Sequence, residues 1–93
     1  MTLERAVENA LVTQAKKDGV LCLKLAPKGL AGWPDRTLLA DGQVMFIETK
    51  RPQGGRLSPQ QRYWLRVLTE HGFTALVCKD ADEARQIVRD FQG

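Results

Sequence analysis

Apolar residues recur at helical spacing over residues 2–18 at the start of the chain. A repeat of three to four residues is typical of an amphipathic helix, and Gly19 ends the pattern. We therefore predict a helix over 2–18, with Thr2 able to cap its first turn. The short apolar run at residues 20–25, which lies between Gly19 and Pro27, predicts a strand. The apolar positions of the helix are Leu3, Ala6, Val7, Ala10, Leu11 and Ala15.

Two further apolar runs, at residues 36–40 and 43–47, flank the dipeptide Asp41-Gly42. An Asp-Gly pair between strand-like runs is a strong signal for a two-residue β-hairpin. If the hairpin is symmetric about this dipeptide, its register follows by counting outward from the turn. The pairs that this register predicts are Ala40 with Gln43, Leu38 with Met45, and Asp35 with Glu48.

The second half of the chain carries two helix-start signals around one apolar run. Ser58 and Gln61 fit a capping box, and the proline between them favours the first helical position, so a helix is predicted to about residue 70. The apolar run at 73–78 predicts a strand. Asp80 and Glu83 fit a second capping box at the start of a last helix.

The predicted order is helix, three strands, helix, strand, helix. This order predicts an α/β fold in which a small mixed β-sheet is flanked by helices. The strand at 73–78 follows a helix, so a crossover connection can bring it parallel to a hairpin strand. Because no repeat or low-complexity tract divides the 93 residues, we expect residues 1–93 to form one domain.

Composition supports a globular domain, with 43% hydrophobic and 27% charged residues. No apolar run is long enough to span a bilayer, and the N-terminus lacks a signal-peptide pattern, so we expect a cytoplasmic protein without membrane contact. Cys22 and Cys78 each lie within an apolar run. Buried, reduced thiols are therefore expected rather than a disulfide or a metal pair.

The positive charge is concentrated in the middle of the chain. The segment from Lys24 to Arg66 holds eight cations and three acids, an excess of +5, whereas the remaining residues hold six cations and eight acids. A basic surround suits a polyanionic substrate bound by its phosphates, although a solvated basic surface gives the same pattern. The cations that we expect to contact nucleic acid are Lys24, Lys28, Arg36, Arg51 and Arg56.

The predicted pairing of Asp35 with Glu48 is unfavourable unless a cation lies between the two side chains. Like charges directly opposite each other destabilise a strand pair, and the surrounding apolar runs indicate a buried sheet. Lys50 lies on the same face, two residues beyond Glu48. A hard divalent ion such as Mg²⁺ binds carboxylate oxygens together with water and phosphate oxygens. The pattern therefore predicts a metal-dependent phosphodiesterase site.

The roles of three further side chains remain open. Glu4 lies within the margin of the apolar face of the first helix and Glu8 lies just past it, so either could reach a site where this helix meets the sheet. Glu4 in the first turn also favours the helix dipole. Gln61 fits the capping box of its own helix. It could also reach the site, because it shares a helix face with apolar residues that point toward the sheet.

These residues resemble the PD-(D/E)xK nuclease superfamily, and more narrowly the small stand-alone VRR-NUC domains of phages and bacteria. Pro34-Asp35 is similar to the first half of the motif, and Glu48-Thr49-Lys50 to the second. Gly32 before the Pro-Asp pair and the Ser-Pro-x-Gln pattern at residues 58–61 fit the VRR-NUC form. The likeness extends over nearly the whole chain, which implies a restriction-endonuclease-like core.

The resemblance implies a role for each matching residue. Asp35 and Glu48 would bind Mg²⁺ or Mn²⁺, with the carbonyl of Thr49 as a further ligand. Lys50 would be the catalytic lysine and Gln61 the helix glutamine of the site, while the glutamate of the first helix would be Glu4 or Glu8. Kinship with Holliday junction resolvases implies a homodimer that cleaves branched DNA in the cytoplasm of a bacterial or phage-infected host cell.

Two other functions are compatible with the sequence. A DNA-binding module with an inactive acid pair would bind DNA without cleaving it. A protein-interaction subunit, using the apolar potential of Tyr63 and Trp64, would have no affinity for DNA even at low salt.

Overall fold

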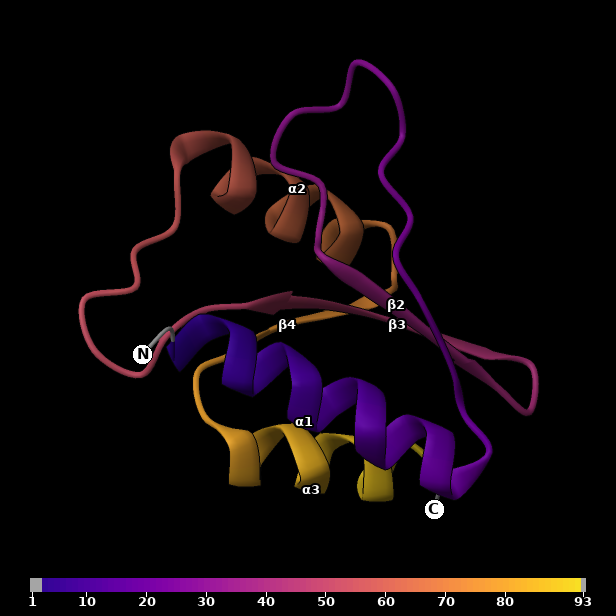
Figure 1. Cartoon of the computed structure of the whole chain (residues 1–93). Helices are drawn as coiled ribbons and strands as arrows, with labels where there is room; N and C mark the ends of the chain where they lie inside the picture. Colours follow the sequence, from indigo (N-terminus) through magenta and orange to yellow (C-terminus); the bar gives the residue numbers. More distant parts are fainter. Residues whose placement is uncertain (1–2, 93) are drawn as a thin grey trace.

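The computed structural model describes residues 3–92, and Figure 1 traces the chain. Thr2, predicted to cap the first helix, lies outside the described residues. The order of elements is the predicted one and confirms the α/β class with a mixed sheet. The elements are α1 (Leu3–Asp18), β1 (Leu21–Leu23), β2 (Arg36–Ala40), β3 (Gln43–Thr49), α2 (Pro59–Glu70), β4 (Thr74–Cys78) and α3 (Ala81–Gln92).

The four strands form one sheet in the order β1-β2-β3-β4. The first three are antiparallel to their neighbours, and β4 pairs parallel to β3 after the crossover through α2. The first strand is shorter than the predicted run at 20–25, because the chain leaves the sheet after Leu23 and approaches Pro27 as a loop.

The hairpin between β2 and β3 has the predicted register. Ala40 pairs with Gln43, and the ladder continues to Arg36 with Ile47, which places Asp35 and Glu48 at the next step. The φ angles of Asp41 and Gly42 are 51° and 76°. Two successive positive φ values are the signature of a type I′ turn, whose twist matches that of the flanking strands.

Helices cover both faces of the sheet. Helices α1 and α3 pack side by side below the sheet in Figure 1, and α2 lies above it. The core between the sheet and the α1–α3 pair is apolar, and its members include Val7, Leu11, Leu38, Ile47 and Val88. Because side chains alternate along a strand, the neighbours of Ile47 on β3 face α2 instead.

An aromatic cluster fills the α2 side of the sheet. Trp33 meets Phe46 edge-on at 5.6 Å between ring centroids, and meets Trp64 of α2 at 5.2 Å. The indole N–H of Trp64 donates to the carbonyl of Ala31 at 3.1 Å. These contacts fasten the long loop between β1 and β2 to α2, just before the chain reaches Asp35.

The helix caps follow the predictions with one correction. Ser58 and Gln61 form a full capping box at the start of α2. At α3, the amide of Glu83 donates to Asp80 as expected, but the Glu83 carboxylate accepts from the amide of Lys79 rather than from Asp80. The predicted second capping box is therefore only half present, because the glutamate side chain reaches one residue further back.

Both cysteines are free thiols, with Cys78 buried and Cys22 half-buried. Between residues 3 and 92, no helix has the length and apolar character that crossing a membrane requires.

Candidate active site

The candidate site lies where β2 begins and β3 ends. Gly32 passes so close to α2 that a Cβ on it would lie 2.6 Å from the Gln60 backbone, and its φ of +89° is also one that favours glycine. Buried Pro34 then sets the backbone that places Asp35 directly before β2. The packing of this loop on α2 therefore fixes the path of the chain into Asp35.

Asp35 is held by the end of β3. Its Oδ2 accepts one hydrogen bond from the Thr49 amide at 3.0 Å and another from the Thr49 hydroxyl at 2.9 Å. Thr49 is itself buried. The sequence indicated Thr49 only through its carbonyl, whereas its hydroxyl and amide are the groups that position Asp35. The signal for this contact is the register, since Thr49 lies next to the partner position of Asp35.

Glu48 is almost fully buried, with 2% of its surface exposed. Its Oε2 accepts a hydrogen bond from Gln61 Nε2 at 2.9 Å and lies 3.7 Å from Lys50 Nζ. Its Oε1 is buried and has no hydrogen-bond partner among residues 3–92. Burial, and then the negative charge of Asp35, raise the pKa of Glu48 to about 8, while Lys50 acts in the opposite direction.

This arrangement fits a divalent cation. A buried carboxylate oxygen without a partner is costly, and Glu48 faces a second carboxylate with only one ammonium nearby. A bound cation would satisfy the free oxygen and remove the repulsion that raises the pKa. Within the described part of the chain, no cluster of three or more Asp, Glu, His or Cys residues could hold a metal. Asp35 and Glu48 are thus two candidate carboxylate ligands, fewer than a divalent ion requires, so water or substrate oxygens would have to complete its shell.

The two glutamates of α1 have different surroundings. Glu8 forms ion pairs with Arg36 Nε at 2.8 Å and Lys24 Nζ at 3.8 Å. Glu4 instead lines a cavity of about 310 Å³ together with Lys50 and the connector residues Arg51, Gly54, Gly55 and Arg56. Glu4 therefore lies on the Lys50 side of the site, whereas Glu8 neutralises cations further along the helix.

Gln61 performs both of the roles that the sequence left open. Its amide oxygen accepts from the Ser58 amide at 2.8 Å and closes the helix cap. Its amide nitrogen donates to Glu48 at the same time. Because the two contacts use opposite ends of one planar amide, the start of α2 fixes the orientation of Glu48.

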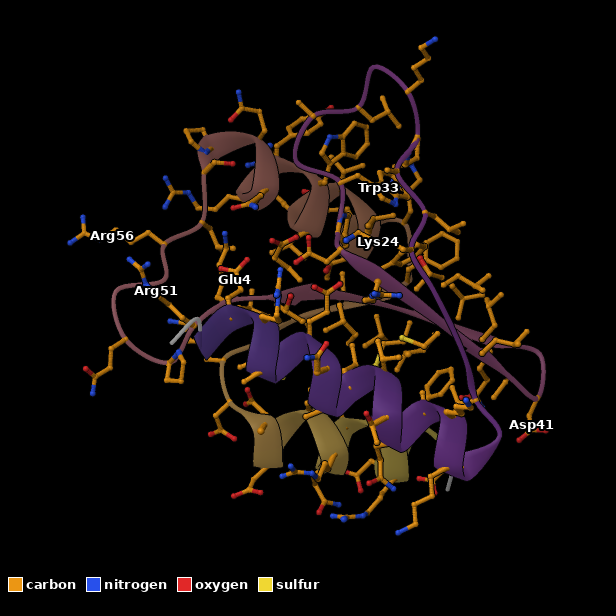
Figure 2. All side chains as sticks on the ribbon, viewed as in Figure 1. Glu4, Lys24, Trp33, Asp41, Arg51 and Arg56 are labelled. Carbon is orange, nitrogen blue, oxygen red and sulfur yellow. The ribbon has the colours of Figure 1, made fainter. Side chains whose placement is uncertain are left out.

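The five predicted nucleic-acid contacts fall into two groups. Lys24, Lys28 and Arg56 are exposed, and Figure 2 shows Arg51 and Arg56 projecting near Glu4, at the end of the molecule away from the Asp41 turn. Arg51 also donates to the carbonyls of Gln53 and Gly54 in its own loop. The side chain of Arg36 is only 18% exposed and forms an ion pair with Glu8, so Glu8 already neutralises its charge.

Sequence reasoning assigned no role to Trp33, which packs between Phe46 and Trp64 directly before the Pro-Asp pair. Its only signal is that it is one of two tryptophans in a chain poor in aromatic residues. The hypothesis of an interaction subunit requires an exposed Trp64, but Trp64 is half-buried and donates a hydrogen bond to the carbonyl of Ala31. Tyr63 remains 46% exposed beneath the Arg66 guanidinium.

Comparison with known proteins gives one family. The model of the VRR-NUC domain matches residues 4–82. "Putative nuclease p44" of Acyrthosiphon pisum secondary endosymbiont phage 1 is 36% identical over 59 residues, which are 62% of this chain and 62% of that protein. The match thus spans about three fifths of the length of that relative.

Two solved structures share the fold over 98% of this chain. One, described as a VRR_NUC domain, has a TM-score of 0.86 at 22% identity and is covered over 99% of its length. The other, a VRR_NUC domain protein, has a TM-score of 0.77 at 18% identity and is covered over 88%. At these identities the likeness establishes the fold, and the chemistry has to be argued from the site.

Proposed function

This chain belongs to the VRR-NUC domain family, and from that membership we propose that it is a metal-dependent DNA endonuclease that hydrolyses phosphodiester bonds. The observation that carries the proposal is the Glu48 carboxylate, which is buried, lacks a partner for Oε1, and lies beside Asp35. When both carboxylates are ionised, Asp35 and Glu48 carry more negative charge than Lys50 balances, so the site favours a cation, and phosphodiester hydrolysis is chemistry that such a cation supports.

Asp35, Glu48 and the Thr49 carbonyl are the proposed ligands of Mg²⁺ or Mn²⁺. When bound there, the ion would supply a Lewis-acid charge that activates water and neutralises the phosphate. Thr49 keeps Asp35 in place through two hydrogen bonds, and Gln61 keeps Glu48 in place through one. The side chains are therefore held before the substrate arrives, which lowers the cost of reorganisation during the reaction.

Lys50 is the proposed catalytic cation. Its side chain is 12% exposed and its ammonium lies 3.7 Å from Glu48, so it is held at the rim of the acid pair. From there the ammonium can orient the attacking water and stabilise the negative charge that grows on the phosphate. Glu4, which shares a cavity with Lys50, is our choice over Glu8 for the helix glutamate of the site.

Branched DNA is the proposed substrate, and a homodimer is the proposed assembly. Cutting both strands at one junction requires two active sites, and one domain of this size provides a single site. Strand β4 lies at the edge of the sheet, and Leu76 on it and Phe73 directly before it are exposed, so this edge offers backbone groups and apolar side chains to a second copy. We place the activity in the cytoplasm of a bacterial or phage-infected cell.

The test is cleavage of four-way, flap, single-stranded and linear DNA with Mg²⁺, Mn²⁺ or EDTA. We expect cleavage with either ion, none in EDTA, and a loss of at least a hundredfold in Glu48→Gln. Glu70→Gln, which changes an exposed carboxylate at the far end of α2, is the matched control and should leave the rate unchanged.

Metal-dependent cleavage that persists at the wild-type rate in Glu48→Gln would refute this site. DNA binding without cleavage under any of these conditions would favour a DNA-binding module instead. Absence of both binding and cleavage at low salt would favour an interaction subunit.

A further inference from the structure

A second cavity lies beside the acid pair, on the side away from β2. Its volume is about 530 Å³, and it is lined by Gly55, Arg56, Leu57, Arg62, Val77 and Lys79. Three of these residues are cations and none is an acid. Arg62 and Lys79 have no role in the site described above.

The register of the sheet places this cavity next to Glu48. Val77 on β4 pairs with Glu48 on β3, so the two residues lie on the same face at a strand spacing of about 4.8 Å. The Lys50 amide donates to the Cys78 carbonyl at 2.9 Å, which continues the ladder and brings Lys79 beside Lys50. On α2, Arg62 directly follows the glutamine that binds Glu48.

The cations of this cavity are not neutralised within the protein. No ion pair involves the side chain of Arg56, Arg62 or Lys79 among residues 3–92. The acids nearest to Lys79 in sequence are Asp80, Asp82 and Glu83. Asp80 and Glu83 accept hydrogen bonds from backbone amides at the start of α3, and Asp82 pairs with Arg85. Three unpaired cations near one another repel, so an anion bound between them stabilises the arrangement.

The walls of the cavity favour a nucleotide over a free ion. Leu57 and Val77 supply apolar surface, which suits the sugar of a DNA strand, while the cations suit its phosphate. Gly55 and Arg56 also line the neighbouring cavity that contains Lys50 and Glu4. The two cavities therefore meet at Gly55 and Arg56, and a DNA strand can pass from one cavity to the other.

We propose that this cavity binds the DNA backbone phosphate next to the scissile one, with Arg62 and Lys79 as its principal ligands. The proposal rests on the proposed nuclease function, because it assumes that the scissile phosphate lies at Asp35 and Glu48. It assigns a direction to the bound strand, which continues from the acid pair toward β4 rather than toward the loop that carries Lys28.

The test measures DNA binding in EDTA by fluorescence anisotropy between 50 and 200 mM salt, so that cleavage plays no part. For the double variant Arg62→Gln/Lys79→Gln we expect about tenfold weaker binding near 0.1 M salt. The slope of log K against log salt should fall by about 0.9, as for the loss of one neutralised phosphate. The matched control is Lys16→Gln/Arg89→Gln, which removes two exposed charges on the opposite side of the sheet.

A second measurement locates the contact. DNA is prepared with a neutral methylphosphonate at one linkage at a time. We expect one linkage, adjacent to the cleaved one, where the substitution weakens binding of the wild type but not of Arg62→Gln/Lys79→Gln. A melting temperature equal to that of the wild type verifies that the double variant is folded, since both side chains are exposed.

The outcomes separate this inference from the proposed function. If the double variant binds with the affinity and salt slope of the lysine–arginine control while the wild type cleaves DNA, the phosphate subsite is refuted and the nuclease stands. If the wild type binds DNA without cleaving it and the double variant loses one phosphate contact, the cavity is a phosphate site, but the nuclease and the placement of this phosphate beside a scissile one are both refuted. Failure of the wild type to bind DNA refutes both.

Discussion

At the scale of single residues, Glu48 is a buried carboxylate whose ionisation is both opposed and favoured by its neighbours. Its carboxylate is buried beside Asp35, an arrangement that opposes ionisation, yet Gln61 and Lys50 are placed to favour the charged form. A carboxylate that served only the stability of the fold would not need to be buried beside a second carboxylate. A cation bound between Asp35 and Glu48 would offset their mutual repulsion. The fold therefore carries a local repulsion at the position where we propose that a metal ion binds.

The two glutamates of α1 provide the first prediction. Glu8→Gln removes the partner of the mostly buried Arg36, so we expect the free energy of unfolding to fall by about 1–3 kcal/mol, between the costs for exposed and buried ion pairs. Glu4→Gln should leave stability within about 0.5 kcal/mol but reduce Mg²⁺-dependent cleavage at least tenfold. Urea denaturation and initial cleavage rates measure the two effects. If Glu8→Gln abolishes cleavage without loss of stability, our choice of Glu4 is wrong.

The sequence could narrow this choice to two residues but not make it. Glu4 and Glu8 are one helical turn apart and both lie near the margin of the apolar face, so helical periodicity treats them alike. What distinguishes them is which part of α1 meets the end of β3, and this depends on how the helix packs across the sheet. By contrast, the pairing of Asp35 with Glu48 could be counted from the Asp41-Gly42 turn, because strand register is a local property.

At the scale of elements, the first turn of α2 connects helix stability to the site. Gln61 closes the cap with its oxygen and binds Glu48 with its nitrogen, so a change at this position can affect either property. The capping box was evident from the sequence, since its spacing is local. The contact with Glu48 was not, because it requires knowing that α2 crosses over the end of β3.

A pair of substitutions at α2 separates the two functions. Gln61→Glu keeps an oxygen for the Ser58 amide but removes the donor to Glu48 and adds a like charge beside it. We therefore expect the helix cap to remain, the melting temperature to fall through repulsion between the two carboxylates, and cleavage to fall at least tenfold. Ser58→Ala removes a cap acceptor and should cost about 1 kcal/mol of stability while cleavage remains within about threefold of the wild type. Thermal melting and cleavage rates test both. Equal cleavage by Gln61→Glu and the wild type would show that the contact with Glu48 is not needed.

The loop between β1 and β2 yields a prediction at Gly32. A Cβ at this position would overlap the Gln60 backbone at 2.6 Å, and backbone atoms cannot easily yield. Gly32→Ala should therefore shift the loop away from α2, lower the melting temperature and reduce cleavage, because Asp35 follows three residues later. Gly29→Ala is the control, since its φ of +82° is similar but no atom lies within 4 Å of its Cβ. If the two variants lose equal stability, backbone strain rather than the close approach explains the effect.

At the scale of the whole molecule, the fold brings the site together from three separate regions of the chain. Asp35 and Glu48 come from one hairpin, Gln61 from the crossover helix, and Glu4 from α1, which packs on the opposite side of the sheet from α2. The class and element order could be predicted because the helices show helical spacing or capping signals, the strands are short apolar runs, and turn residues separate them. The cavities could not, because their walls combine residues from elements that touch only after packing. Arg62 and Lys79 are an example, since nothing in their sequence neighbourhoods relates them.

The pKa of Glu48 predicts how the stability of the whole protein depends on pH and on metal ions. Between pH 4.5 and about 8, the folded protein keeps a proton on Glu48 that the unfolded chain releases. The unfolded state then binds fewer protons than the folded state, so in EDTA the Glu48 contribution to stability falls as pH rises through this interval, by at most about 1.4 kcal/mol per unit. Above about pH 8 both states are ionised and this contribution stops changing.

A divalent ion should reverse this trend, because it binds the ionised carboxylates and only in the folded protein. We therefore expect Mg²⁺ or Mn²⁺ to raise the melting temperature little at pH 6 and clearly more at pH 8.5, and Glu48→Gln to lose both the pH dependence and the metal effect. Melting curves in EDTA and in 10 mM metal across this range provide the measurement, and Glu70→Gln should behave as the wild type. Because this readout does not involve DNA, it tests the acid pair as a metal site independently of any substrate. A metal effect of equal size at both pH values, or one that survives in Glu48→Gln, would place the ion elsewhere on the protein.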